Sequence, residues 1–236
     1  MNSVGTIASL WRFPVKSMLG EQLTQAPVDV RGVLGDRLYA VRDPDGKLGS
    51  GKNTRRFRRM PGLFDFRARY DGLTPVITLP DNTEVRGDDE HVHWAIANAL
   101  GRPEVTLARE DVISHFDEQP LHIVTSASVR RLADLVPHIE TDERRLRPNL
   151  VIDVPETAGH PEDRWVGREL HIGSHLVLDI VQRAQRCVMV NLAQDELPES
   201  PDVLYAISEA NTMDLGVHAR VLAPGRIRVG DEVFLA

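Results

Sequence analysis

The sequence DIVQRAQRCVMVNL, residues 179–192, contains the single cysteine of the chain, Cys187. Arg183 and Arg186 precede this cysteine and an apolar run follows it, which predicts a strand over residues 187–192. Nearby positive charge makes a thiol easier to ionise, and a thiolate is both a nucleophile and a soft metal ligand. A lone cysteine at a strand edge is more often a small apolar core residue. Taken alone, Cys187 therefore leaves both interpretations open.

Three further segments accompany this stretch, namely LWRFPVKSMLG at residues 10–20, RLRPNLVIDV at residues 145–154 and GRIRVGDEVFL at residues 225–235. Their order along the chain resembles that of the MOSC-domain family, the molybdenum cofactor sulfurase C-terminal family, whose members include amidoxime-reducing proteins. The resemblance covers nearly the whole chain. It implies an N-terminal MOSC β-barrel-like domain over residues 1–90, packed on a MOSC β-barrel core over residues 91–236.

The local pattern predicts a mainly β protein with short helices. Alternating apolar residues and turn signals indicate strands over residues 5–13, 37–41, 64–70, 75–80, 149–154, 169–173, 176–181 and 226–235. One helix is expected over residues 91–100, ending at Gly101, and another over residues 127–135, with Thr125 or Ser126 as its N-cap.

The composition limits the classes of function. With 236 residues and 42% hydrophobic content, the chain can build its own core, and its net charge of −7 argues against general attraction to nucleic acid or anionic membranes. One cysteine excludes an intramolecular disulfide and an iron–sulfur cluster, so the electrons of a redox reaction would come from a separate flavin or iron–sulfur reductase. The absence of a secretory signal or a membrane-length apolar run predicts a cytoplasmic protein.

The loop GKLGSGKN, residues 46–53, resembles a phosphate-binding P-loop but departs from it. Asn53 stands where a Mg²⁺-binding Ser or Thr is required, and no amphipathic helix follows, so nucleotide hydrolysis is not favoured. Glycines beside Lys52 still suit an anion. The basic run that continues through Arg55, Arg56, Arg58 and Arg59 is either a solvated loop or part of that anion site.

The resemblance to the MOSC-domain family assigns roles to several residues. It implies that Cys187 is the thiolate ligand of a molybdenum ion held by a pyranopterin dithiolene, and that the site lies in the cleft between the two domains. Segment 50–53 replaces a Thr-Ala-Arg-Gln segment of the family, which places Lys52 at the arginine. The expected cofactor contacts are Lys16, Ser17, Lys52, Asn53, Arg56, Thr125, Ser126, Ser128, Arg147 and Asn149.

Each of these residues also has a simpler interpretation. Lys16 would ordinarily be a solvent-exposed lysine at a strand end, and Thr125, Ser126 and Ser128 an N-cap cluster. Arg147 and Asn149, on either side of Pro148, would ordinarily make a hydrogen bond at the start of a strand.

The expected activity is the two-electron reduction of N-hydroxylated or N-oxide-type small molecules. The alternative is a non-catalytic protein that carries or binds molybdenum cofactor or sulfur. A zinc site among the nine histidines is a weaker hypothesis, because His91 and His93 would point to different faces of a helix. The sequence contains neither a GxSxG elbow nor an HExxH helix, so serine hydrolase and zinc protease activities have no support.

Overall fold

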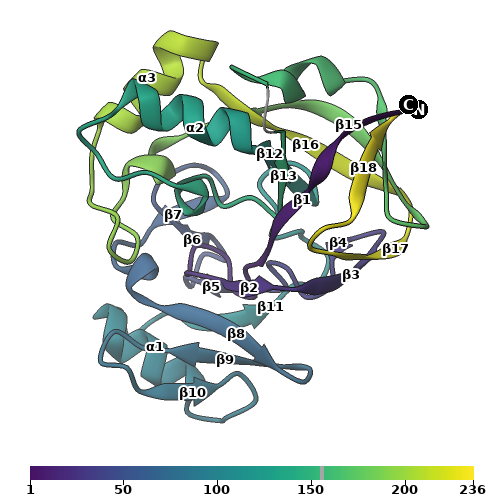
Figure 1. Cartoon of the computed structure of the whole chain (residues 1–236). Coiled ribbons are helices and arrows are strands. Elements are labelled where there is room, and N and C mark those ends of the chain that lie inside the picture. The colour runs from purple at the N-terminus through teal and green to yellow at the C-terminus, as the bar shows by residue number, and fades with distance from the viewer. Residues whose placement is uncertain (155–156) are drawn as a thin grey trace. The chain divides into compact units, whose positions relative to one another are not determined.

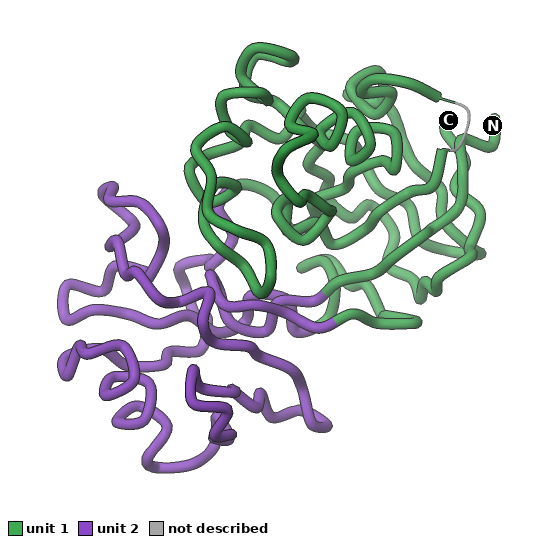
Figure 2. The backbone as a smooth tube through the Cα atoms, turned by 60° about the vertical axis from the view of Figure 1, so that its left-hand side comes forward, with its two compact units in different colours: residues 1–11, 22–34, 118–236 green, residues 12–21, 35–117 purple. Residues whose placement is uncertain are grey.

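The computed structural model describes residues 1–154 and 157–236, which form two compact units (Figure 1; Figure 2). Unit 1 comprises residues 1–11, 22–34 and 118–236, and unit 2 comprises residues 12–21 and 35–117. Each unit buries its own hydrophobic clusters. Within the described residues, no helix combines the length and apolar character needed to cross a membrane.

Unit 1 is built on a closed barrel. Its sheet has the order β13-β12-β16-β15-β14-β18-β1-β2, and an additional pairing of β13 with β1 closes the first seven strands. In this sheet β12 and β13 pair in parallel, with Ile123 opposite Leu150. The strands are β1 (Asn2–Arg12), β2 (Glu21–Leu23), β12 (Leu121–Thr125), β13 (Leu150–Asp153), β14 (Glu169–Ile172), β15 (Leu176–Gln185), β16 (Asp214–Ala223) and β18 (Glu232–Leu235).

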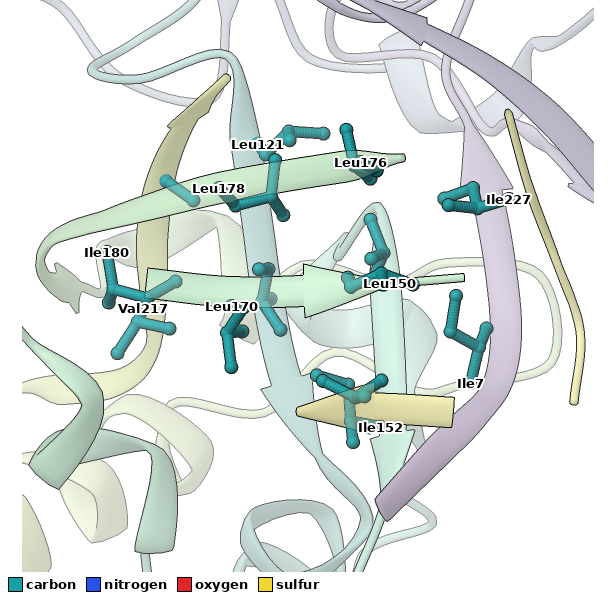
Figure 3. Packing of buried hydrophobic residues seen from close by; sticks show 14 of the residues in the cluster. Ile7, Leu121, Leu150, Ile152, Leu170, Leu176, Leu178, Ile180, Val217 and Ile227 are labelled. Carbon is teal, nitrogen blue, oxygen red and sulfur yellow. The ribbon is translucent and has the colours of Figure 1, made fainter. Parts of the chain in front are cut away.

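The interior of the barrel is filled by alternate residues of its strands. Along β15, Leu176, Leu178 and Ile180 are fully buried while the residues between them are partly exposed, as the two-residue period of a strand requires. Figure 3 shows these side chains packed with others of the cluster, such as Leu150 and Val217. Truncating such a leucine to alanine typically costs about 2–5 kcal/mol.

Smaller elements surround this barrel. A three-stranded sheet has the order β17-β3-β4, from β3 (Gln25–Asp29), β4 (Gly32–Val33) and β17 (Gly225–Arg228). The helices α2 (Ser126–Leu135) and α3 (Asp202–Asn211) pack in a second hydrophobic cluster (Figure 1). The helix α2 contributes Leu132 to it, and α3 contributes Val203 and Ile207. Three 3₁₀ helices complete the described part of unit 1: η2 (Glu143–Leu146), η3 (Pro161–Trp165) and η4 (Val188–Asn191).

Unit 2 contains two sheets and one α-helix. One sheet has the order β11-β5-β6-β7, from β5 (Tyr39–Arg42), β6 (Leu48–Ser50), β7 (Phe57–Arg59) and β11 (Thr106–Arg109). The other has the order β10-β9-β8, from β8 (Arg67–Asp71), β9 (Thr74–Thr78) and β10 (Glu84–Arg86). The helix α1 (Val92–Leu100) and the 3₁₀ helix η1 (Leu63–Asp65) contribute Ile96 and Leu63 to its core.

The mainly β character with short helices is confirmed. The helix α1 ends at Gly101, which has the left-handed conformation with φ of 62° that favours glycine. Thr125 is the N-cap of α2, since its side chain accepts a hydrogen bond from the Ser128 N–H.

Three predicted strands differ from the structure. Residues 188–191 form the 3₁₀ helix η4, in which only Val190 is buried, so the apolar run VMV has no strand-like alternation. Phe64 lies in η1, and the following strand begins only at Arg67. The predicted strand 226–235 is divided into β17 and β18 by a turn at Gly230, whose φ is 90°.

Candidate functional site

Cys187 lies in unit 1 between the end of β15 and the start of η4. Its backbone is extended, with φ of −136°, and its carbonyl accepts a hydrogen bond of 3.1 Å from the Val190 N–H. The cysteine is not disulfide-bonded and is partly exposed. This position differs from that of an apolar core residue, since a partly exposed thiol is accessible to a ligand.

Arg186, the residue before the cysteine, is fixed by three contacts. Its backbone N–H donates to the Met213 carbonyl at 2.7 Å, and its Nη2 donates to the Leu146 carbonyl at 2.7 Å. Its Nη1 lies 3.2 Å from His122 Nε2. Arg186 therefore ties the Cys187 segment to the end of η2, where Arg147 follows Leu146.

The residues after the cysteine are held by Arg145, whose side chain is fully buried. Its Nη2 donates to the carbonyls of Pro198 at 2.7 Å and Glu140 at 3.0 Å, and its Nη1 donates to the Val190 carbonyl at 3.4 Å. Burial lowers the pKa of Arg145 from its usual value. Arg145 and Arg186 thus hold the backbone on both sides of Cys187, a role that sequence reasoning missed for Arg145.

Arg147 and Asn149 are both buried at the start of β13. Arg147 has a left-handed backbone, with φ of 52°, at the C-cap of η2. Asn149 joins three strands, because its Oδ1 accepts from the His122 N–H at 3.1 Å and its Nδ2 donates to the Trp11 carbonyl at 3.4 Å. The side-chain amide of Asn149 therefore makes hydrogen bonds at the start of a strand, as expected for a residue with a structural role.

The hydroxyls at the start of α2 contact two carboxylates. Thr125 Oγ1 donates to Glu162 Oε2 at 2.6 Å, and Ser128 Oγ donates to Glu162 Oε1 at 2.5 Å. Ser126 Oγ donates to Asp153 Oδ1 at 2.7 Å. Burial raises the pKa of Glu162, and the hydrogen bonds from Ser128 and Thr125 oppose this increase. These described contacts support an N-cap and anchoring role.

Three cations of unit 2 surround the ring of Phe57, and we call these four residues, Lys16, Lys52, Arg56 and Phe57, the basic cluster. The Nζ atoms of Lys16 and Lys52 each lie 5.0 Å from the ring centroid, and Arg56 Cζ lies 5.3 Å from it. Lys16 is 5% exposed, in contrast to a solvent-exposed lysine at a strand end. An aromatic ring attracts cations through its quadrupole, so Phe57 helps to hold like charges together.

An acidic residue lies at this cluster, since Lys16 Nζ is 2.6 Å from Asp117 Oδ1. Burial alone would raise the pKa of Asp117, but Lys16, Lys52 and Arg37 outweigh this effect and lower the pKa to about 2. The carboxylate is therefore ionised at neutral pH. Sequence reasoning did not find Asp117, because it is separated from Lys16 by 101 residues.

The loops of unit 2 that carry the basic cluster are tied to one another. Ser17, with a left-handed φ of 65°, donates its hydroxyl to the Gly49 carbonyl at 3.0 Å. Gly49 is closely packed, since a Cβ there would lie 2.8 Å from Leu63 Cδ1 and 2.9 Å from Met60 Sδ and would require these side chains to shift. The predicted glycine loop and the segment with Lys16 are thus brought together.

Two further predicted residues, Asn53 and Arg56, contact backbone groups. Asn53 is exposed, and its Oδ1 accepts from the Arg59 N–H at 2.7 Å. Arg56 Nη2 donates to the carbonyls of Ser114 at 2.7 Å and Phe116 at 3.0 Å. Lys16 and Lys52 are therefore better placed than Asn53 to meet an anion.

A protein-only metal site finds no support in the described residues, where no three His, Cys, Asp or Glu side chains form a group that could hold a metal ion. The zinc hypothesis for the histidines therefore gains nothing from the structure. A metal that is bound mainly by its own cofactor needs fewer protein ligands, and Cys187 suits that case.

Comparison with known proteins finds similar proteins that match nearly the whole chain. Human mitochondrial amidoxime-reducing component 1 is 25% identical, over 100% of this chain and 84% of the relative, and human mitochondrial amidoxime reducing component 2 is 26% identical, over 99% and 84%. The crystal structure of the YUAD protein from Bacillus subtilis superposes with a TM-score of 0.55 at 15% identity, over 98% of this chain and 94% of that one, which shows a shared fold.

Two family descriptions match the sequence. The MOSC N-terminal beta barrel domain matches residues 4–118, and the MOSC domain matches residues 101–234, more than half of the chain. The chain belongs to the MOSC-domain family.

Proposed function

We propose that this protein is a molybdenum-cofactor-dependent reductase of N-hydroxylated or N-oxide-type small molecules, which receives electrons from a separate flavin or iron–sulfur reductase. The family match and the similarity to amidoxime-reducing components support this proposal. The structural observation that carries it is Cys187, a partly exposed thiol whose neighbouring backbone is held on both sides by Arg145 and Arg186.

The donor set fits a molybdenum ion bound by a pterin dithiolene. The dithiolene supplies sulfur ligands of its own, so the protein needs to add only one soft ligand, and a thiolate is such a ligand. The cofactor also has an anionic phosphate, for which Lys16 and Lys52 offer two cations at one aromatic ring. Arg147, a proposed pterin contact, directly follows Leu146, whose carbonyl accepts a hydrogen bond from Arg186.

The chain's own residues would bind and orient rather than perform the redox step. When bound, the cofactor supplies the two-electron chemistry that moves an oxygen atom. The Cys187 thiolate would hold the metal, and Arg145 and Arg186 would keep that sulfur in place. Lys16 and Lys52 would hold the phosphate by charge-assisted hydrogen bonds. Reduction of an N-hydroxyl group consumes two electrons and two protons and releases water, so the donor protein must deliver both electrons.

Element analysis of protein from a cofactor-competent host tests this proposal. We expect about one molybdenum ion and one releasable pterin per chain, together with reductase activity when a suitable electron donor is added. Full zinc occupancy without molybdenum would contradict the proposal. Stoichiometric molybdenum without turnover on any N-hydroxylated substrate would instead favour the non-catalytic carrier.

A further inference from the structure

His122, on β12 of unit 1, points away from the barrel core. Its neighbours Leu121 and Ile123 belong to that core, and successive side chains of a strand point to opposite faces. His122 is nevertheless buried, with 6% of its surface exposed. It pairs with His218 of β16, and the two rings meet edge to face with their centroids 5.5 Å apart. A buried imidazole therefore lies on the outer face of this sheet, with no role in the function proposed above.

The fold leaves room for this ring. Gly216 has a left-handed φ of 83°, and a Cβ there would lie 2.6 Å from His122 Nε2 and 2.7 Å from the Ile123 carbonyl oxygen. The backbone of His122 is fixed as well, because its N–H donates to Asn149 Oδ1 at 3.1 Å and its carbonyl accepts from the Asn149 N–H at 2.7 Å. Ring and backbone are both held, so Nε2 has a defined position.

The contacts of Nε2 determine where the ring carries its proton. Nε2 lies 3.2 Å from Arg186 Nη1 and 3.4 Å from the Leu215 carbonyl oxygen. A guanidinium has donors and no acceptor, and it keeps its charge in proteins. With a proton on Nε2, two donors would face each other at 3.2 Å. Nε2 is therefore the acceptor from Arg186, and His122 is the neutral tautomer with its proton on Nδ1.

His122 completes the contacts that orient the guanidinium of Arg186. Nη2 donates to the Leu146 carbonyl at 2.7 Å, so acceptors from η2 and from β12 hold the two ends of the guanidinium fork. A planar guanidinium that is held at two nitrogens cannot rotate without breaking both hydrogen bonds. Because Arg186 directly precedes Cys187, the direction of its side chain constrains the backbone that carries the thiol.

We propose that His122 is a positioning residue for Cys187. Its neutral imidazole orients Arg186, and Arg186 in turn fixes the segment that carries the thiol. This inference rests on the proposed function for its effect at the metal, where Cys187 is the protein ligand. The contact between His122 and Arg186 belongs to the chain itself and can be tested without a cofactor.

Two substitutions separate the hydrogen bond from the packing of the ring. His122→Gln keeps an acceptor oxygen within reach of Arg186, whereas His122→Leu fills similar space without an acceptor. The matched control is His115→Leu in unit 2. His115 is also buried, and its Nε2 lies 2.9 Å from Arg42 Nη2. This control therefore removes a comparable contact between histidine and arginine from the other unit.

Cofactor-free full-length protein provides the first two measurements. Nitrogen-15 NMR of wild type should show His122 protonated at Nδ1 and unprotonated at Nε2. Amide hydrogen exchange at Arg186 and Val190 reports the backbone hydrogen bonds on either side of Cys187. Both rates are divided by that of the Ile180 amide in β15, so that a change in global stability cancels.

We expect His122→Leu to raise both exchange ratios about tenfold, because the charged Arg186 loses an acceptor. His122→Gln should remain within about threefold of wild type, and His115→Leu should leave the ratios unchanged. In molybdenum-loaded protein, the visible charge-transfer band should shift in His122→Leu and return to the wild-type position in His122→Gln. Loss of packing alone does not predict this rescue.

The outcomes separate this inference from the proposed function. A proton on Nε2 in wild type, or equal exchange ratios in wild type and His122→Leu, would overturn the positioning role. An unchanged charge-transfer band in molybdenum-loaded His122→Leu would overturn it as well. If no protein held molybdenum while the exchange difference persisted, the proposed function would be contradicted and His122 would still position Cys187.

Discussion

The segment around Cys187 and the basic cluster around Lys16 are held by different forces. The Cys187 segment is anchored by arginine side chains that donate to neutral backbone carbonyls, including those of Val190, Pro198 and Leu146. In the basic cluster Arg56 donates to backbone carbonyls, whereas Lys16 is held by an ion pair with Asp117 and lies at the ring of Phe57. The carbonyls that accept from Arg145 and Arg186 belong to the folded backbone, whereas an anionic group of a ligand can replace the side-chain carboxylate of an ion pair. The first arrangement suits a fixed metal ligand and the second suits a reversible anion contact.

The largest expected effect concerns Arg145. Arg145→Met leaves buried carbonyls without their donor, and each such group costs about 1–3 kcal/mol. Because removing the buried charge offsets part of this cost, we expect the free energy of unfolding to fall by about 3 kcal/mol. Urea unfolding measures this change. Reaction of the single thiol with an aromatic disulfide reagent should also become faster, because Cys187 is less constrained.

The neighbouring Arg144 provides the matched control. Its guanidinium pairs with the carboxylates of Asp142 and Glu196 at 2.5 Å and 2.7 Å, and its side chain is 25% exposed. Arg144→Met should cost about 1 kcal/mol or less, as surface ion pairs do. Similar losses in the two variants would show that buried carbonyl contacts do not distinguish the Cys187 segment.

The second effect concerns cofactor retention. Lys52→Ala removes a proposed charge-assisted phosphate contact of about 1.5–3 kcal/mol, so cofactor dissociation should be at least about tenfold faster than in Arg59→Ala. Lys52 lies at the Phe57 ring, whereas Arg59 is exposed. Loss of pterin fluorescence from the protein over time measures the rates. The same rate in both variants would show that the basic run is only a solvated loop.

The third effect is a pH dependence in unit 2. His115 is fully buried, its Nδ1 lies 3.2 Å from the Arg37 carbonyl, and its Nε2 lies 2.9 Å from Arg42 Nη2. Burial, followed by the charge of Arg42, lowers the pKa of His115 from 6.5 to about 4. Between these values the unfolded chain binds a proton that the folded chain does not, so the free energy of unfolding decreases as the pH falls from 6.5 towards 4.

By this linkage, proton binding to His115 in the unfolded chain should lower the free energy of unfolding by about 2 kcal/mol between pH 7.5 and pH 5. His115→Gln, which does not titrate, should lose correspondingly less over the same range. Urea unfolding of both proteins at the two pH values provides the measurement. Parallel losses would show that another group dominates the acid sensitivity.

The smallest effect concerns the N-cap of α2. Thr125→Ala removes the side-chain acceptor of the Ser128 N–H and one donor to Glu162, and should lower the free energy of unfolding by about 1 kcal/mol. We expect cofactor retention to remain at the wild-type level, since the described contacts of Thr125 are internal. A marked loss of retention, without loss of stability, would instead support a direct pterin contact.

The fold was largely predictable where the local pattern is regular. Residues 127–135 follow an N-cap and have helical periodicity, and apolar residues alternate over 176–181 as in a strand. Both predictions agree with the structure, which has α2 and β15 there. The strand predicted over residues 187–192 is wrong because its backbone is held by Arg145, an interaction over 45 residues that no local pattern contains. The helix α3 and the strand β16 were missed as well.

The sequence motifs of the candidate site were predictable, but the contacts between their side chains were not. Lys16, Lys52 and Cys187 were proposed from their segments, and in the structure the first two lie at one aromatic ring. Asp117 and Glu162 were not found, because acidic residues carry no distinctive signal until folding places them beside Lys16 or Ser128.

The central claim is that the Cys187 thiolate is the protein ligand of the molybdenum ion. Molybdenum-edge X-ray absorption on wild type and Cys187→Ser, at matched molybdenum content, tests it most directly. Oxygen would replace sulfur at the metal, so we predict one sulfur neighbour fewer in the variant and a shifted charge-transfer spectrum, even though the fold is retained. An unchanged sulfur count together with unchanged turnover would remove Cys187 from the metal and contradict the proposed mechanism.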